Sequence, residues 1–220
     1  MELNITRDAI DLLLRANDLK DEKATRYDKG KFTKNMLLAL KLYDRLLSEI
    51  GETPGLLAAK ANCQFRLASL EPKFERFQEA IALMKRAIAL VPNDADLHVG
   101  LAGYYELATN EYKDAADECR KAIELSPYDV EALRQAAFLY RYPERVVSLE
   151  ESVSWLERLI VLEPNNAGYH AFLAEQYQSI GRFQDANREA IRALLCPRPL
   201  ESGWIDTMKH ILDFEGKQDI

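Results

Sequence analysis

Apolar residues recur along most of the chain at the three- and four-residue spacing of an amphipathic helix, in pairs of runs separated by a polar turn. In the pair after Pro92, the first run has the apolar positions Leu97, Leu101, Ala102 and Tyr105. A turn is expected at residues 108–111, and the second run then has Ala115, Cys119, Ala122 and Ile123. Each pair of runs predicts two helices that bury one face against each other.

A proline follows the second run of each pair and marks an internal repeat. The four prolines are Pro92, Pro127, Pro164 and Pro197, at spacings of 35, 37 and 33 residues. Proline lacks an N–H and restricts the residue before it, so it is expected to end each second helix. The segment after Pro127 has the longer connection RYPERVVS, and Ser148 and Glu151 are spaced as a capping box for the helix that follows.

Small residues occupy equivalent positions in successive repeats. The first helices have Ala102, Ala137 and Ala174, and the second helices have Ala115, Ala122, Ala186 and Ala193. Only a small side chain lets two helices cross closely. Together with Leu, Tyr, Gly and Pro at fixed offsets, matched best in residues 167–197, these positions resemble the tetratricopeptide-repeat (TPR) family. The resemblance implies an all-α, right-handed α-solenoid of helix-turn-helix repeats with a C-terminal capping helix.

The repeat pattern also predicts the organisation of the chain. The expected segments are a divergent N-terminal helix pair at 1–54, a TPR-like repeat at 55–92, a TPR at 93–129, a TPR with a turn insertion at 130–166, a TPR at 167–198, a capping helix at 199–214 and a tail at 215–220. A stacked array needs a cap with a polar outer side, so the capping helix is expected to cover the last repeat. Its apolar side would carry Trp204, Met208, Ile211 and Leu212.

Charge and composition narrow the class of partner. The chain has 36 acidic and 29 basic residues and a net formal charge of -7, which disfavours binding to nucleic-acid phosphates. No uncharged run approaches the roughly 20 residues that span a bilayer, so no membrane insertion is expected. The three cysteines lie far apart without a CxxC pair, which favours reduced thiols in the cytoplasm. We therefore expect a cytoplasmic protein with a protein or peptide partner, and the oligomeric state stays open.

No motif in the sequence predicts catalysis, a cofactor or a metal site. The nine glycines form neither GxxxxGK[ST] nor GxGxxG, and the sequence has no HExxH and no paired CxxC. His98 and His170 each occur six residues after a repeat proline, where the TPR family holds a large packing residue. We interpret both histidines as packing residues rather than ligands, and we expect the protein not to be an enzyme.

Binding in a helical-repeat array is expected on the concave surface, formed by the exposed faces of the first helices. Subtraction of the packing positions leaves three rows of residues on that surface. They are Asp96, Val99, Gly103 and Glu106, then Glu131, Arg134, Phe138 and Arg141, and then Gly168, Ala171, Glu175 and Gln178. The middle row differs from its neighbours because it has two cations around an aromatic ring.

Two interpretations of the middle row stay open. In the first, Phe138 contacts an apolar part of a bound peptide, while Arg134 and Arg141 bind a carboxylate or phosphate. In the second, the two arginines pair with Asp96, Glu106 or Glu175 inside the groove. The lysine and asparagine clamp by which some TPR proteins hold the acidic tails of chaperones is not matched in this sequence.

The predicted function is that of a non-enzymatic scaffold or adaptor, which binds a peptide or a partner's helix in the concave groove. Two alternatives are an assembly or secretion chaperone for a client protein, and a regulatory subunit of an enzyme complex. A helical-repeat protein that binds RNA is a third alternative, which the acidic balance and the regular prolines disfavour.

Overall fold

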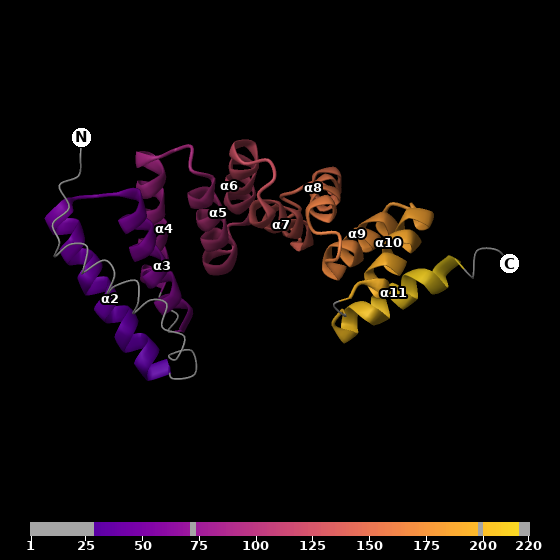
Figure 1. Ribbon diagram of the computed structural model, residues 1–220, viewed down its shortest axis with the longest axis horizontal. Coiled ribbons are helices and arrows are strands. Elements are labelled where there is room, and N and C mark those ends of the chain that lie inside the picture. Colours follow the sequence, from indigo (N-terminus) through magenta and orange to yellow (C-terminus); the bar gives the residue numbers. More distant parts are fainter. Residues whose placement is uncertain (1–28, 71–73, 198–199, 216–220) are drawn as a thin grey trace. The chain divides into compact units, whose positions relative to one another are not determined.

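The structure is a computed structural model that describes residues 29–70, 74–197 and 200–215. In these ranges all regular secondary structure is helical (Figure 1). The chain divides into two compact units, Met1–Leu125 and Ser126–Ile220, a division that the repeat pattern did not predict. The first helix expected within 1–54 falls in residues 1–28 and so lies outside the described residues.

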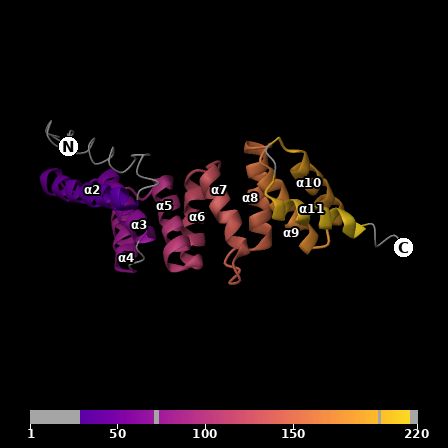
Figure 2. The same ribbon diagram turned by 90° about the horizontal axis from the view of Figure 1, so that it is seen from below.

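The N-terminal unit is a series of helices in which each packs on the next. The elements are α2 (Lys29–Ile50), α3 (Pro54–Leu70), α4 (Phe74–Leu90), α5 (Ala95–Tyr104), the π-helical turn η2 (Tyr105–Thr109) and α6 (Tyr112–Leu125). Figures 1 and 2 both show α3 beside α4 and α5 beside α6. The apolar positions of α2 recur at helical spacing, and its Met36, Tyr43 and Leu46 are buried in one cluster with Leu56 and Leu67 of α3.

The connection between α2 and α3 is short because both helix ends are capped. Gly51 has a φ of 80°, which favours glycine, and its N–H donates to the Leu47 carbonyl at 3.1 Å. Thr53 Oγ1 accepts the Leu56 N–H at 3.3 Å, and Pro54 occupies the first position of α3. The chain therefore reverses within three residues and packs α3 against α2.

The turn of the repeat at 93–129 differs from the expected one. The sequence predicts a turn at 108–111, whereas the first helix continues as η2 through Thr109. The Asn110 N–H donates to the Tyr105 carbonyl five residues earlier, the bonding of a π-helix, and Asn110 has a left-handed φ of 56°. The wider turn accommodates the extra residue that this repeat has relative to the repeat at 167–198.

The C-terminal unit contains two further helix pairs and one more helix. The elements are α7 (Val130–Phe138), the 3-10 turn η3 (Leu139–Arg141), α8 (Leu149–Leu162), α9 (Ala167–Ser179), α10 (Phe183–Leu195) and α11 (Ser202–Glu215). Asp129 caps α7 by accepting the Ala132 N–H at 2.7 Å. The capping box that the sequence predicts for Ser148 and Glu151 is confirmed at the start of α8.

The four repeat prolines end the second helices as the sequence predicts. The helices α4, α6, α8 and α10 end at Leu90, Leu125, Leu162 and Leu195, each two residues before a proline. Cys196, which precedes Pro197, has an extended backbone with φ of -60° and ψ of 142°. A proline disfavours the helical conformation of the residue before it, so each second helix stops at this position.

Helix α9 is the most covered element of the C-terminal unit. It packs against α8, α10 and α11 (Figure 2). Nine of its thirteen residues are buried. Ala174 on α9 and Ala186 and Ala193 on α10 have at most 1% of their surface exposed, which confirms their predicted role at the close helix crossing. The expected capping helix is observed as α11, whose Met208 and Ile211 are buried.

Candidate functional site

A pocket of about 580 Å³ in the C-terminal unit is the candidate site. It is lined by residues from η3, from α9 and from the start of α11, and we call it the α11 pocket. The lining residues that matter below are Arg141, Phe172, Glu175, Gln176, Glu201 and Trp204.

The start of α11 places Trp204 at the pocket. The Glu201 carbonyl accepts the N–H groups of Trp204 and Ile205 at 3.0 and 3.2 Å, which forms the first turn of the helix. Burial of Met208 and Ile211 fixes the helix on α9 and α10. Because Trp204 lies one turn before Met208, its half-buried ring faces α9, where Phe172 meets it edge-on with ring centroids 6.5 Å apart.

Arg141 is held by aromatic rings. Its guanidinium carbon lies 5.0 Å from the ring centroid of Phe138, 4.6 Å from that of Phe172 and 5.1 Å from that of Trp204. Each such cation–π contact contributes about 0.5–1 kcal/mol at an exposed site. No carboxylate forms an ion pair with Arg141 within the described ranges. The rings therefore contact the face of the guanidinium, while the N–H groups point outward from its edge.

Arg134 has a different environment, because it pairs with a carboxylate of its own helix. Its Nε donates to Glu131 Oε2 at 2.9 Å, and its Nη2 forms an ion pair with Glu131 Oε1. Donation from Arg134, and then from Gln135, lowers the pKa of the Glu131 carboxyl. The second interpretation named Asp96, Glu106 and Glu175 as partners of the arginines. The observed partner, Glu131, lies one helical turn away, where an ion pair forms without any long-range contact.

The structure corrects the sequence prediction at two of the nine predicted site residues. Ala171 was predicted to lie on the exposed face, but it is fully buried because α9 is covered by three helices. Val99 was predicted to be exposed, but it has only 9% of its surface exposed. The side chains of these two residues are therefore packing groups in this structure and offer no surface to a ligand.

The other predicted site residues fall into the two units. Gly103 and Glu106 are half-buried in the N-terminal unit, and Glu175 is exposed in the C-terminal unit. Phe138 is half-buried and meets Phe172 edge-on at 5.1 Å between ring centroids. The structure thus brings Phe138 and Arg141 together at one cluster with Glu175 lining the adjoining pocket, whereas Arg134 is engaged by Glu131.

Of the ten residues that line the α11 pocket, the sequence predicted only Arg141 and Glu175 as site residues. Trp204 was assigned to the cap, and Phe172, Gln176 and Glu201 were not considered for binding. The sequence held a signal for Trp204, because an aromatic residue in the first turn of a capping helix faces the preceding repeat. Gln176 gave no signal, since a buried glutamine in α9 cannot be distinguished by sequence from an exposed one.

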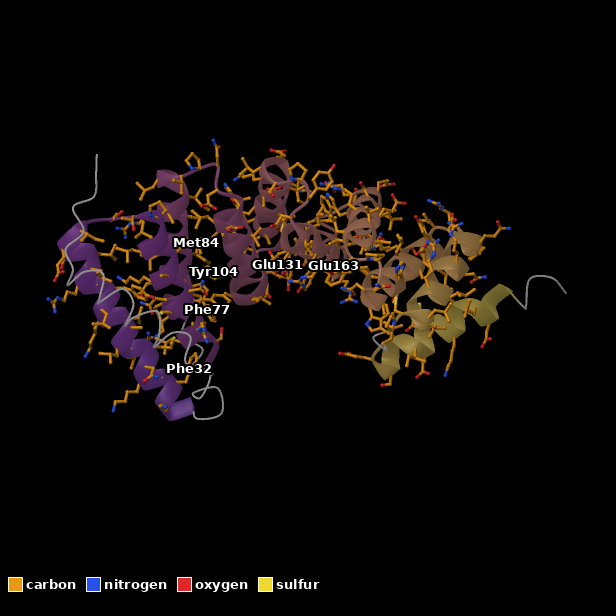
Figure 3. The ribbon with its side chains drawn as sticks, viewed as in Figure 1. Phe32, Phe77, Met84, Tyr104, Glu131 and Glu163 are labelled. Carbon is orange, nitrogen blue, oxygen red and sulfur yellow. The ribbon has the colours of Figure 1, made fainter. Side chains whose placement is uncertain are left out.

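The N-terminal unit has an aromatic cluster of its own, which serves packing. Phe65 stacks on Tyr104 with ring centroids 4.4 Å apart and meets Phe77 at 5.5 Å; Figure 3 labels Tyr104 and Phe77. Burial raises the pKa of the Tyr104 phenol above its usual range, and its hydroxyl has no hydrogen-bond partner among the residues that the structure describes. Since Tyr104 is buried, the cluster stabilises the contact between α3, α4 and α5.

His98 and His170 are buried, as predicted, but they also form the same polar contact in two repeats. His98 Nδ1 lies 2.6 Å from Glu118 Oε2, and its Nε2 lies 3.0 Å from the Pro92 carbonyl oxygen. His170 Nδ1 lies 2.7 Å from Glu189 Oε2, and its Nε2 lies 3.0 Å from the Pro164 carbonyl oxygen. Each imidazole thus connects the second helix of its repeat to the proline that precedes the repeat. The sequence signal was available, because a glutamate follows each histidine at nearly the same distance.

The described residues show no group of three or more His, Cys, Asp or Glu side chains that could hold a metal ion. Within the same part of the chain, no helix combines the length and the apolar character needed to cross a membrane.

The helix pairs, the buried alanines and the prolines after the second helices define an all-α repeat protein, and solved structures identify its fold. YrrB, described as a TPR protein with an unusual peptide-binding site, matches with a TM-score of 0.62 at 18% identity over 94% of this chain and 92% of that one. A MamA 41-end chain from Desulfovibrio magneticus RS-1 matches with a TM-score of 0.60 at 14% identity over 98% and 99%. TTC0263, a thermophilic TPR protein of Thermus thermophilus, matches with a TM-score of 0.53 at 19% identity over 90% and 98%. The chain therefore has the fold of TPR proteins, which confirms the resemblance seen in the sequence.

Sequence comparison gives a narrower result. No family model matches the chain. A segment of 90 residues is 27% identical to sperm-associated antigen 1 of Mus musculus, and it makes up 41% of this chain and 9% of that protein. The likeness therefore concerns a small part of that relative.

Proposed function

We propose that the protein is a non-enzymatic interaction scaffold whose C-terminal unit binds a peptide, or a helix of a partner protein, at the α11 pocket. The observation that carries the proposal is the pocket itself. Its volume of about 580 Å³ lies within the roughly 300–1,000 Å³ that is usual for ligand sites. Tryptophan and arginine, which dominate the binding energy of many interfaces, are both at its wall.

The surroundings of the pocket support binding rather than a chemical reaction. The ring of Trp204 and the guanidinium of Arg141 are positioned by packing on helices, so little conformational entropy is lost when a ligand meets them. A solved structure with the same fold, YrrB, is described as having a peptide-binding site, and this supports the proposal by analogy of fold. In the described residues, no observation favours the chaperone or the enzyme-subunit alternative over a scaffold.

A peptide library displayed on phage tests the proposal. The full chain is immobilised, bound sequences are enriched, and the selected peptides are synthesised and titrated against the wild type and a Trp204→Ala variant. We expect Trp204→Ala to weaken binding about 30-fold, since truncation of an interface tryptophan typically costs at least about 2 kcal/mol. Tyr128→Ala is the matched control, because Tyr128 is an exposed aromatic residue of the same unit that does not line the pocket.

The result that contradicts the proposal is specific to the pocket. If no peptide is enriched above background, or if the selected peptides bind wild type and Trp204→Ala equally, the α11 pocket is not the binding site. Far-UV circular dichroism of each variant shows whether the helices are retained.

A further inference from the structure

We propose that the α11 pocket takes a basic side chain, lysine or arginine, of the bound peptide. The inference rests on the proposed function and deepens it by naming the chemistry of the residue that enters the pocket. It departs from the interpretation of the sequence, which assigned a carboxylate or phosphate to Arg141.

The acceptors left free at the pocket belong to Glu175, Glu201 and Gln176, beside the N–H donors of Arg141 and Trp204. Glu175 and Glu201 are exposed, and neither carboxylate has an ion pair or a hydrogen bond within the described part of the chain. Gln176 has only 2% of its surface exposed, and its Nε2 donates to Ser152 Oγ at 2.7 Å. Its Oε1 is buried with no donor, which is unusual for a buried amide.

The hydroxyl donors at the pocket are already used. Ser179 Oγ donates to the backbone carbonyl of Gln176 at 2.7 Å, and Thr207 Oγ1 donates to the backbone carbonyl of Gly203 at 3.0 Å. Tyr140, the remaining hydroxyl of the lining, can donate or accept. A ligand group that only donates fits the three free acceptors, and the side chains with several donors and no acceptor are the ammonium of lysine and the guanidinium of arginine.

Charge leads to the same ligand. The lining has one cation, Arg141, and two carboxylates, Glu175 and Glu201, so it carries a net charge of about -1. The guanidinium of Arg141 is in contact with three rings, which stabilise its charge at this exposed position. An anion would gain from Arg141 but would meet two unpaired carboxylates, whereas one cation neutralises the whole set. The apolar stem of a lysine or arginine can lie along Trp204 while its charged end reaches the carboxylates.

Nuclear magnetic resonance of the full, ¹⁵N-labelled chain tests the inference with small probes. The probes are the N-acetyl methylamides of arginine, lysine, glutamate and norleucine, of which norleucine supplies an apolar stem without charge. The signal followed is the indole N–H of Trp204, assigned through Trp204→Phe, and the indole of the buried Trp155, which does not line the pocket, is the internal reference. We expect saturable shifts of the Trp204 signal with the two basic probes only, and weaker binding at about 0.5 M salt than at about 0.02 M.

Paired charge variants give the control. Glu175→Gln with Glu201→Gln is expected to lower the affinity for the basic probes about threefold to tenfold, because exposed ion pairs are individually weak. Glu144→Gln with Glu150→Gln makes the same change in net charge at exposed positions outside the pocket, and it should leave the affinity unchanged. Equal shifts with the glutamate or norleucine probe, or equal effects of the two double variants, overturn the inference.

The phage peptides separate this inference from the proposed function. If they bind in a manner that depends on Trp204 and carry a basic residue whose replacement by norleucine weakens binding about tenfold, both stand. If they depend on Trp204 but carry no such residue, the scaffold stands and the basic side chain is wrong. If neither the library nor the basic probes give binding at the pocket, both are wrong.

Discussion

The contact of His170 with Glu189 predicts that the C-terminal unit loses stability as the pH rises above 6.5. Both ring nitrogens of His170 face acceptors, the Glu189 carboxylate at 2.7 Å and the Pro164 carbonyl at 3.0 Å. A neutral imidazole has one N–H donor, so only the imidazolium can donate in both directions. The hydrogen bond to Glu189 raises the pKa of His170 above 6.5, although burial opposes the shift.

The sign of the pH dependence follows from the direction of the two pKa shifts. Because the folded state raises the pKa of His170, its contribution to stability is complete below the unfolded value of 6.5 and is lost as the pH rises through the folded value. For Glu189, burial would raise the pKa, but donation by His170 and the charge of Arg192 lower it overall from 4.5. Its contribution is therefore complete above pH 4.5 and is lost as the pH falls through the folded pKa. The pair stabilises the unit most between pH 4.5 and 6.5.

Glu189→Gln removes the carboxylate while it keeps the shape of the side chain. A hydrogen bond to a charged group contributes about 1.5–3 kcal/mol, and both side chains here are 5% exposed, so solvent competes little. We expect a loss of about 2 kcal/mol in the free energy of unfolding near pH 5.5, and a smaller loss near pH 8.5, because the contribution of His170 is lost as the pH rises through its folded pKa. Arg192→Gln is the control for the second partner of Glu189, since Arg192 donates to Glu189 Oε1 at 2.7 Å from an exposed position and should contribute at most about 1 kcal/mol.

Urea unfolding followed by tryptophan fluorescence is the assay. The sequence has two tryptophans, Trp155 and Trp204, and both belong to the C-terminal unit, so the signal reports this unit. Two results would refute this role of His170. One is an equal loss of stability in Glu189→Gln at both pH values, and the other is an equal change in stability between pH 5.5 and pH 8.5 in the wild type and in His170→Gln.

Three further predictions concern local contacts of the described residues. Ser148→Ala removes the acceptor of the Glu151 N–H at the capping box and should cost about 1 kcal/mol in urea unfolding, and an unchanged midpoint would contradict the cap. Ser152→Ala leaves a buried carbonyl and a buried amide without their partner and should cost about 1–3 kcal/mol, whereas alanine at the exposed Ser154 of the same helix should cost little; equal effects would be contrary to the burial. With a thiol reagent, the half-buried Cys196 should react first, while the two fully buried cysteines react only on unfolding. The rate of Cys196 should increase with pH, because burial raises the pKa of its thiol and the thiolate is the reactive form. A second thiol that reacts as fast in the folded protein would contradict the burial of the other two.

The fold could be predicted from the sequence because its determinants are local and repeat. A proline ends a helix wherever it occurs, and an alanine at a crossing lets two helices approach, so four prolines and a series of alanines were enough to predict the helix pairs. The capping box at Ser148 is equally local, since its two hydrogen bonds join residues three apart. The division after Leu125 was not predictable in this way, because it depends on the contacts that each unit forms within itself and not on a local sequence signal.

Burial of the predicted site residues could not be predicted with the same certainty. The helical period shows which side of a first helix faces its own second helix, but not which side a later helix covers. Helix α11 contacts α9, and α8 also packs on α9, so Ala171 is buried although its own repeat leaves it free. For the same reason the histidines were correctly predicted to be buried, while their carboxylate partners, 19 and 20 residues later on the second helices, were missed.

The chemistry of Arg141 shows why an arginine beside an aromatic residue is ambiguous in a sequence. Within one helix, Phe138 and Arg141 are compatible with a guanidinium that points to solvent and binds an anion. The addition of Phe172 from α9 and Trp204 from α11 gives the guanidinium face three rings, and the free acceptors that remain nearby belong to glutamates and a glutamine. The rings thus contact the face of the Arg141 guanidinium, and the two unpaired carboxylates of the lining outnumber this one cation, which favours a cationic ligand. The identity of a ligand therefore follows from the groups left unpaired after folding rather than from the most conspicuous charge in the sequence.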